Sequence, residues 1–382
     1  MLYKYDCHYF DGYKPCRFKR LCDGCTAYRP VGTRIAIISL EALGAVLRST
    51  CLLTPIRRSY PDSHITWITL SNARPLLLEN SLIDRIITVS DKTLSLLHFL
   101  QFDVLFSVDK SPSAGALAEQ IKAKKKFGFG LTPGGAIRPL SEEGAYQFRV
   151  GLDDHLKFFI NQKPETQQIT ETMGLPWQRD GYILELSPQE KQKSQRLYRE
   201  LSPPRGGLLG FNTGCSVLYP YKKMTIKKSI ELIAMWRETF PNWRILLLGG
   251  PEDETRQKEM KQAFGEDDDV IDTPTKQGLR EGIIWMSLAD FVFTGCSLGL
   301  HLAIALKKYT ICWFGVSCAQ EIDLYGRGRK LQAAVNCSPC WRKSCDKDIK
   351  CFDQVSLDEI RNATREAVNR ISKRDHEPSP HL

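Results

Sequence analysis

Short apolar runs alternate with helical segments twice along this chain, and that alternation restricts the fold more than any other feature. In the first series the expected strands are 34–38, 64–69, 83–89, 103–109 and 125–130. In the second series they are 207–211, 244–248, 270–271, 291–293 and 309–314. Strands that alternate with helices predict a parallel, doubly wound sheet. Two such series predict an α/β chain with two Rossmann-like domains.

The segments around these two series differ from them in composition. Residues 1–32 are loop-rich and hold a group of cysteines, whereas 181–206 are rich in Glu, Gln, Lys and Pro. The predicted order is a cysteine-rich segment at 1–32, a first domain at 33–180, a linker at 181–206, a second domain at 207–372 closed by a helix at 357–371, and a frayed tail at 373–382. Two domains joined by a polar linker predict a cleft between them, where ligand pockets are common.

The overall composition, 42% hydrophobic and 25% charged, is typical of a soluble globular protein. No apolar run approaches the roughly 18–20 residues that span a bilayer. The polar start of the chain does not resemble a signal peptide, so we expect a cytoplasmic protein. The net charge of +9 favours an anionic substrate or peripheral contact with an acidic membrane surface. Solubility alone explains that charge equally well, and no nucleic-acid partner is expected.

Cysteines are unusually frequent, with 13 in the chain, and most of them fall into two clusters. The late cluster, which is the stronger candidate for metal binding, comprises Cys337, Cys340, Cys345 and Cys351. The early cluster comprises Cys7, Cys16, Cys22 and Cys25. In a reducing compartment, clustered cysteines bind metal more often than they form disulfides, and four thiolates suit structural zinc or iron. Free thiols in the early segment, disulfides after export, and one site with ligands from both ends are the alternatives.

The stretch 289–306 joins the apolar run 291–293 to a helix through the small residues 294–297. A strand that turns tightly into a helix presents free backbone N–H groups and the positive end of the helix dipole at one point. Such a point binds phosphate. An ordinary strand-to-helix turn is the alternative interpretation, and this stretch alone favours it.

Six short pieces, in order along residues 33–372, together resemble glycosyltransferase family 9, the heptosyltransferases. They are Gly44-Ala-Val-Leu-Arg48, Asn212-Thr-Gly214, Tyr221-Lys-Lys223, Leu248-Gly-Gly250, Thr294-Gly-Cys-Ser-Leu298 with His301-Leu-Ala303, and Trp313-Phe-Gly315. The resemblance implies the GT-B fold, in which two Rossmann-like domains face a cleft and the C-terminal domain binds the sugar donor. It also implies transfer of a heptose from an ADP-activated sugar to the lipopolysaccharide core, with no metal needed for the chemistry.

One branch of that family resembles this chain in further respects. The cysteine-bearing ends, Leu43-Gly-Ala-Val46 and Asp109-Lys-Ser111 are similar to the autotransporter heptosyltransferases. Members of that branch add heptose to serines of a secreted protein and carry a cysteine-bound iron near the C-terminus. The resemblance therefore implies a protein serine as the alternative acceptor, iron as a candidate metal, and a homo-oligomer.

Inverting transfer needs a base for the acceptor hydroxyl and positive charge at the leaving diphosphate. The family usually places an aspartate directly after the glycine of its first loop, but here Gly44 is followed by Ala45, and both are expected on the acceptor side. Asp109, at the end of the fourth strand, is the expected base; its alternative role is to cap the following helix. Lys222 is expected to neutralise the diphosphate, with Lys223 as a substitute or both as a solvated basic pair.

The other expected donor contacts follow strand ends of the second domain. They are Asn212, Thr213, Gly214, Gly249, Gly250, Glu252, Thr294, Gly295, Cys296, Ser297, Leu298 and His301. His301 suits packing as well as phosphate contact. The family usually has an aspartate where this chain has Cys296, and a thiol is a far weaker acceptor. Because Ala45 and Cys296 both depart from the family, a catalytically degenerate binding protein is the alternative function, and a metal or redox sensor is a third.

Overall fold

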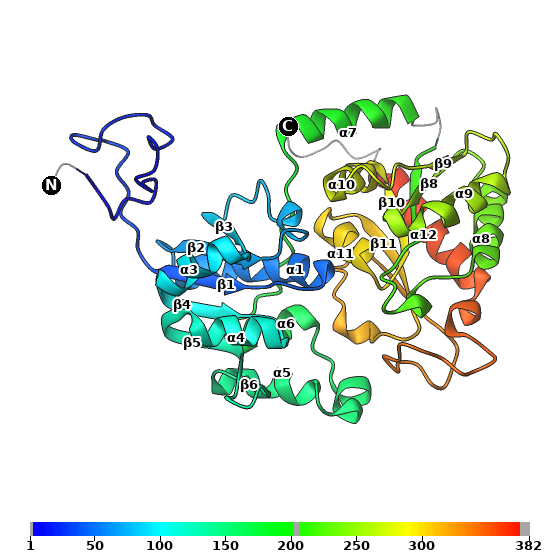
Figure 1. The fold of residues 1–382 in the computed structure, drawn as a ribbon. Coiled ribbons are helices and arrows are strands. Elements are labelled where there is room, and N and C mark those ends of the chain that lie inside the picture. The colour runs from blue at the N-terminus through cyan, green and yellow to red at the C-terminus, as the bar shows by residue number, and fades with distance from the viewer. Residues whose placement is uncertain (1–2, 202–205, 375–382) are drawn as a thin grey trace. The chain divides into compact units, whose positions relative to one another are not determined.

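The computed structural model describes residues 3–201 and 206–374, and the chain forms two compact units (Figure 1). The first unit contains the chain up to Leu152 together with Thr166–Asp180. The second contains Asp153–Glu165 and the chain from Gly181 onward. Each unit is built around one six-stranded, mainly parallel sheet with helices between the strands. The predicted α/β fold with two Rossmann-like domains is therefore confirmed.

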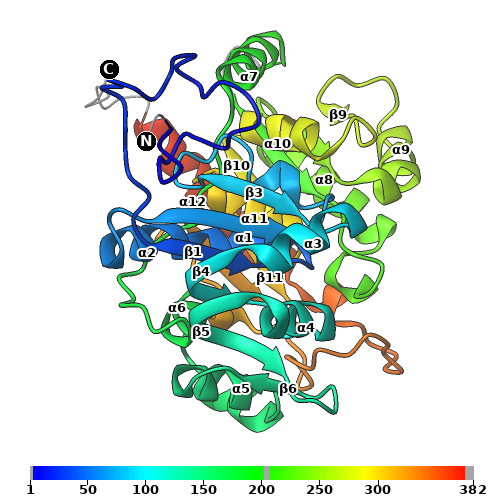
Figure 2. The same cartoon turned by 60° about the vertical axis from the view of Figure 1, so that its left-hand side comes forward.

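The first sheet has the strand order β3-β2-β1-β4-β5-β6, and only its β5–β6 pair is antiparallel. Figure 2 shows β3, β1, β4, β5 and β6 following one another across it. Its elements are β1 (Arg34–Ile38), α1 (Leu43–Ser49), α2 (Leu53–Ser59), β2 (His64–Thr69), β3 (Arg85–Thr88), α3 (Asp91–Phe99), β4 (Gln101–Ser107), α4 (Pro112–Gln120), β5 (Lys122–Leu131), β6 (Ile137–Pro139), α5 (Ala145–Val150) and α6 (Glu165–Thr172). From Ile35 to Ile38, β1 is fully buried, as its apolar run predicts.

The second sheet has the order β12-β11-β10-β7-β8-β9 and is parallel throughout. Its elements are α7 (Pro188–Leu201), β7 (Leu208–Asn212), α8 (Ile226–Thr239), β8 (Arg244–Leu248), α9 (Glu254–Gln262), β9 (Val270–Asp272), α10 (Leu279–Leu288), β10 (Phe291–Gly295), α11 (Leu298–Ala305), β11 (Tyr309–Phe314), β12 (Gly328–Gln332) and α12 (Leu357–Arg374). In Figure 1, α10 and α11 lie on one face of this sheet, and α8, α9 and α12 lie on the other.

Three large aromatic side chains fill the space between the second sheet and α8. Phe211 from β7, Trp236 from α8 and Phe293 from β10 contact one another edge to face, with ring centroids 5.2 to 5.7 Å apart. All three are almost fully buried. Edge-to-face pairs at this spacing add attraction to the apolar burial. This contact fixes β7 and β10 as neighbours, and both strands lead into expected site segments.

The strand registers bring the expected site segments together within each unit. In the first sheet, Ile38 at the end of β1 lies beside Ser107 at the end of β4. In the second, Asn212 at the end of β7 is flanked by Thr294 of β10 and Leu248 of β8. Loops that follow neighbouring parallel strands meet at the same sheet edge, which is where α/β proteins bind ligands.

Some elements were not expected. Strand β6 has three residues, and in β12 only Leu331 is buried, so neither carries an apolar run. Residues 188–201, part of the segment expected to link the domains, form α7, which ion-pairs to α10 through Lys193 and Glu281. No helix within the described residues is both long and apolar enough to span a membrane.

Candidate functional site

Asp109 holds the loop that follows β1. Its Oδ1 accepts a hydrogen bond from Ser39 Oγ at 3.2 Å. Its Oδ2 accepts from the backbone N–H of Leu40 and, at 3.1 Å, from that of Glu41. The cap of α4 is a different residue, Ser111, whose side chain accepts from Ala114 N at 3.3 Å. Asp109 therefore does not cap the helix that follows it; it joins the ends of β1 and β4.

Burial raises the pKa of Asp109, and the charge of Glu41 acts in the same direction. The hydrogen bonds from Leu40, Glu41 and Ser39 stabilise the carboxylate and oppose that rise. A carboxylate with a raised pKa is a stronger base than an exposed one, which suits proton removal from a hydroxyl. Glu41 is an exposed second carboxylate in the same loop. It is the first acid after β1, although it is not among the site residues expected from the sequence.

Gly44 and Ala45 lie in the first turn of α1, a few residues beyond the loop that Asp109 holds. Ala45 N donates to the carbonyl of Ala42, and its own carbonyl accepts from Ser49 Oγ at 2.7 Å. Both residues are half-buried. The start of α1 thus lies close in sequence to the residues that donate hydrogen bonds to Asp109.

Asn212 ties together three segments of the second unit. Its Nδ2 lies 3.1 Å from the carbonyl of Gly214, 3.0 Å from Thr294 Oγ1 and 3.1 Å from Ser297 Oγ. Gly299 faces the same side chain so closely that an added Cβ would lie 2.4 Å from Asn212 Cγ. The ends of β7 and β10 and the start of α11 are therefore held by one amide.

A buried carboxylate, Asp253, organises the neighbouring loops. Its Oδ2 accepts from the backbone N–H of Gly250 at 3.0 Å, and its Oδ1 lies 3.4 Å from Lys223 Nζ. Gly214 packs directly on it, since a Cβ there would lie 1.8 Å from Asp253 Oδ2. Glu252, the acid expected at this site, is exposed. Asp253 is not among the donor contacts expected from the sequence, although it directly follows Glu252.

The loop around Asp253 also fixes Thr213 and Gly249. Thr213 donates through both its N–H and its Oγ1 to the carbonyl of Leu248, at 2.8 and 3.2 Å. A Cβ on Gly249 would lie 2.8 Å from Gln257 Nε2, so this glycine allows β8 to run close to α9. Thr213, Gly214, Gly249 and Gly250 therefore lie together at one sheet edge.

Two adjacent lysines, Lys222 and Lys223, have different surroundings. Lys223 is paired with Asp253, as described above. The Lys222 ammonium lies over two aromatic rings, 4.1 Å from the ring centroid of Trp341 and 4.9 Å from that of Tyr219. The Lys222 carbonyl would be 2.2 Å from a Cβ on Gly295, so the backbone here packs on the end of β10. Lys223 is thus paired with a carboxylate, whereas the Lys222 ammonium lies over aromatic rings.

The turn between β10 and α11 begins with the buried residues Thr294 and Gly295. Ser297 is the N-cap residue of α11, and Leu298 begins the helix. Cys296 between them is half-buried. This is the strand–turn–helix arrangement that the sequence predicts for phosphate binding. Because α11 has only eight residues, its N-terminus offers an anion site only together with the neighbouring loops that Asn212 and Asp253 hold.

His301 lies in a buried aromatic group. Its Nδ1 is 3.3 Å from the hydroxyl of Tyr182, and the two rings lie 5.8 Å apart by their centroids. Tyr182 in turn contacts Tyr325 edge to face at 6.2 Å. Since His301 is 7% exposed, these contacts favour the packing interpretation that the sequence analysis set beside phosphate contact.

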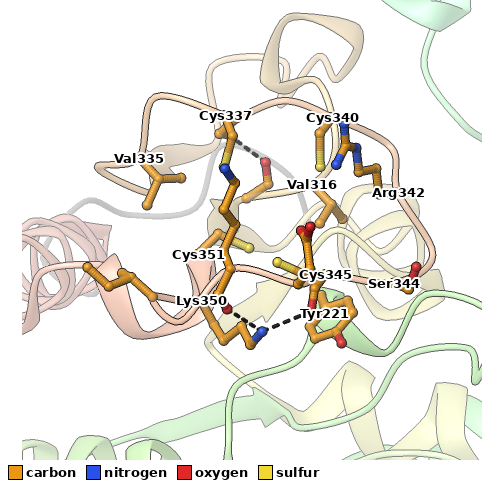
Figure 3. A pocket seen from close by; sticks show the side chains of 15 residues that line it. Tyr221, Val316, Val335, Cys337, Cys340, Arg342, Ser344, Cys345, Lys350 and Cys351 are labelled. Carbon is orange, nitrogen blue, oxygen red and sulfur yellow. Dashed lines mark hydrogen bonds between the residues drawn. The ribbon is translucent and has the colours of Figure 1, made fainter.

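All four late cysteines line one cavity of about 300 Å³ (Figure 3). Burial raises the pKa of Cys351 to about 11, and the three other thiols of the cluster add to that rise. The early cysteines line a second cavity of about 500 Å³. None of the 13 cysteines is in a disulfide. Across the described residues, no three His, Cys, Asp or Glu side chains are arranged to hold a metal ion, so the predicted metal sites are not confirmed.

No protein-family model matches the chain. It is 23% identical over 305 residues to lipopolysaccharide heptosyltransferase 1 of Campylobacter coli, covering 74% of this chain and 84% of that protein. A glycosyltransferase family 9 structure from Veillonella parvula DSM 2008 matches with a TM-score of 0.69 at 16% identity, over 89% of this chain and 98% of that one. The chain is thus similar in sequence to a heptosyltransferase and in fold to a glycosyltransferase of family 9.

Two further solved structures share the fold of this chain. E. coli ADP-heptose lipopolysaccharide heptosyltransferase II matches with a TM-score of 0.66 at 14% identity, over 88% of this chain and 99% of that one. TibC of enterotoxigenic E. coli H10407, an iron-containing dodecameric glycosyltransferase, matches with a TM-score of 0.53 at 12% identity, over 89% of this chain and 77% of that one. The predicted resemblance to glycosyltransferase family 9 and its GT-B fold is confirmed.

Proposed function

We propose that this chain transfers a heptose from an ADP-activated sugar to an acceptor hydroxyl with inversion at the anomeric carbon. The homology to a heptosyltransferase supports the class of reaction. The observation that carries the donor assignment is the convergence at one edge of the second sheet, where Asn212 and Asp253 hold the loops beside Lys222. Backbone N–H groups, a hydroxyl and an ammonium at one place suit a nucleoside diphosphate.

In the proposed step, Asp109 takes the proton of the acceptor hydroxyl as the acceptor oxygen bonds to the anomeric carbon. The bond from that carbon to the β-phosphate oxygen breaks, and ADP leaves with the electron pair. Lys222 stabilises the negative charge that grows on the diphosphate. Asp109 belongs to the first unit and Lys222 to the second.

Two acceptors fit this proposal, a sugar of the lipopolysaccharide core and a serine of a protein. The first is suggested by the relatives named as lipopolysaccharide heptosyltransferases, and the second by the resemblance of this sequence to the autotransporter heptosyltransferases. The two classes are separated by supplying ADP-heptose with either a heptose-free lipopolysaccharide core or a serine-rich autotransporter domain. Mass spectrometry of each acceptor shows which one gains a heptose.

The late cysteines are the proposed ligands of a structural zinc or iron ion. Four soft sulfur donors around one cavity fit either metal chemically, although their positions do not form a metal-binding group. The ion would stabilise the segment that carries these cysteines, and it would take no part in the sugar transfer. Metal analysis of the purified chain, with Cys337→Ser beside Cys215→Ser as a control at a lone buried cysteine, tests this assignment. Unchanged metal content in Cys337→Ser contradicts it.

The experiment that tests the proposed function measures transfer from ADP-heptose by wild type, Asp109→Ala and Lys222→Ala. We expect transfer by wild type and a loss of about 10²- to 10⁴-fold without the base. If the wild type binds ADP-heptose but modifies neither acceptor, the alternative of a degenerate binding protein is correct. Full activity of Asp109→Ala would show that another group, such as Glu41, removes the proton.

A further inference from the structure

Trp341 is the aromatic residue of the late cysteine cluster, directly after Cys340, and it contacts the proposed diphosphate lysine. The ammonium of Lys222 lies 4.1 Å from its ring centroid. Tyr219 contacts both partners, with its ring 4.9 Å from the same ammonium and edge to face with Trp341 at 5.5 Å and 87°. An ammonium this close to an aromatic ring is attracted by the negative potential of the ring face.

The backbone holds Trp341 in a fixed position. Its N–H donates to the carbonyl of Val316 at 2.8 Å, and the N–H of Cys340 donates to the same oxygen at 3.1 Å. Trp341 has a φ of 50°, in the left-handed region that bulky residues seldom adopt. Val316 follows β11 closely, so the backbone of Trp341 is anchored at the carboxyl edge of the second sheet. A residue held in an uncommon conformation at such an edge is a candidate for function.

A second lysine shares the same ring. The ammonium of Lys157 lies 4.5 Å from the Trp341 ring centroid, and that of Lys222 lies 4.1 Å from the same centroid. The distance between the two ammoniums is therefore at most the sum of these two distances. Gln320 Nε2 donates to the carbonyls of Lys157 and Phe158 at 3.3 and 3.1 Å, which fixes this segment. Glu321 lies 3.9 Å from Lys157 Nζ and offsets part of its charge. Two cations on one indole favour an anion in the same place.

We propose that Trp341 is a positioning residue that holds the Lys222 ammonium in place for the diphosphate of the donor. This role rests on the proposed function. A lysine side chain has many rotamers in water, and ordering it when the ligand arrives costs free energy. An aromatic face that orders the lysine beforehand reduces that cost, and so strengthens binding of a nucleoside diphosphate. The cysteine-rich segment thereby becomes a wall of the donor site.

The test measures ADP affinity by calorimetry on the full chain. Trp341→Leu removes the ring face but keeps apolar volume, and we expect ADP to bind about 3- to 30-fold more weakly. Trp341→Phe keeps a smaller ring face, so its loss should be smaller. Trp285→Leu, at a half-buried tryptophan of α10 that bonds Glu281, is the matched control and should bind ADP as the wild type does. Thermal unfolding of each variant checks that it folds.

A double-mutant cycle separates positioning from a general structural role. In the Lys222→Gln background, Trp341→Leu should change ADP affinity by less than about twofold, because the group it holds is already gone. An equal loss in both backgrounds overturns the proposal, as does wild-type affinity in Trp341→Leu. Failure of the wild type to bind ADP would instead refute the proposed donor site itself, so the two failures are distinguishable.

Discussion

Replacing Gly214 with alanine tests the arrangement around the buried Asp253. The added methyl group would lie 1.8 Å from Asp253 Oδ2 and 2.6 Å from its Cγ, far inside van der Waals contact. Asp253 is 2% exposed and has a short side chain. It cannot turn aside without leaving the N–H of Gly250 and the ammonium of Lys223. The substitution should therefore break this group of contacts.

The cost follows from the contacts that are lost. A hydrogen bond from a backbone N–H to a carboxylate contributes roughly 1.5–3 kcal/mol, and the Lys223 pair, whose lysine is partly exposed, adds about 0–1 kcal/mol. We expect Gly214→Ala to lower the free energy of unfolding by about 2–4 kcal/mol. For a unit of this size the melting temperature should fall by about 5–15 °C. Differential scanning calorimetry measures the shift, and ADP affinity should fall with it.

Gly282 provides the matched control. It lies inside α10, and a Cβ there would meet no atom within 4 Å. Gly282→Ala should raise stability by roughly 0.5–1 kcal/mol, since alanine is the better helix former. With the carboxylate removed by Asp253→Ala, Gly214→Ala should cost little. A melting temperature of Gly214→Ala within about 2 °C of wild type, or an equal cost in the Asp253→Ala background, refutes the reasoning.

Three further outcomes are expected. Because burial raises the pKa of Asp109, the rate of transfer should fall as pH drops through that raised pKa, at a higher pH than an exposed aspartate would give. The free energy of unfolding that Asp109 contributes is greatest at low pH and is lost as pH rises through the same raised pKa. A pH–rate profile checks the first outcome, and unfolding measured as a function of pH checks the second. Lys223→Gln should lower the melting temperature by leaving a buried carboxylate unpaired. Lys222→Gln should weaken ADP binding about tenfold and lower the melting temperature less, because it loses only contacts with aromatic rings and leaves no buried charge unpaired. Equal effects of both substitutions on binding would contradict the assignment. Metal uptake should weaken as pH falls, because ligating thiols must lose their protons, and the effect should be absent in Cys337→Ser by metal analysis at each pH.

The sequence alone was sufficient to predict those strands whose residues are all buried, because burial leaves a continuous apolar run in the sequence. The run from Ile35 to Ile38 predicts β1 because a strand covered on both faces must be apolar throughout. That the loops after β1 and β4 should lie near each other was also predictable, since Asp109 follows a parallel strand. The structure has the two loops in contact, because Ser39 Oγ donates a hydrogen bond to Asp109 Oδ1 at 3.2 Å. Polar β12 gave no such signal, because only Leu331 in it is buried.

The partners of the site residues could not be predicted in the same way. Asn212 and Ser297 are separated by 85 positions, and their contact depends on β7 and β10 being neighbours. Hydrophobic periodicity shows that a strand exists but not which strand lies beside it. Trp341 likewise reaches Lys222 only through the path of the chain after β11. The cysteine spacing shows that four sulfur donors lie close together in the sequence, but it does not determine where their side chains point.

The amide of Asn212 has a consequence for how this sheet edge responds to a ligand. A side-chain NH₂ carries two hydrogens, yet three oxygens surround it within 3.1 Å, on Gly214, Thr294 and Ser297. The three acceptors therefore compete for two protons, and at any moment one of them receives no hydrogen bond from the amide. An arriving oxygen at Ser297 can turn that hydroxyl toward itself while the amide serves the other two. A ligand oxygen can thus take the place of one acceptor at this edge, while the amide keeps a hydrogen bond to each of the other two.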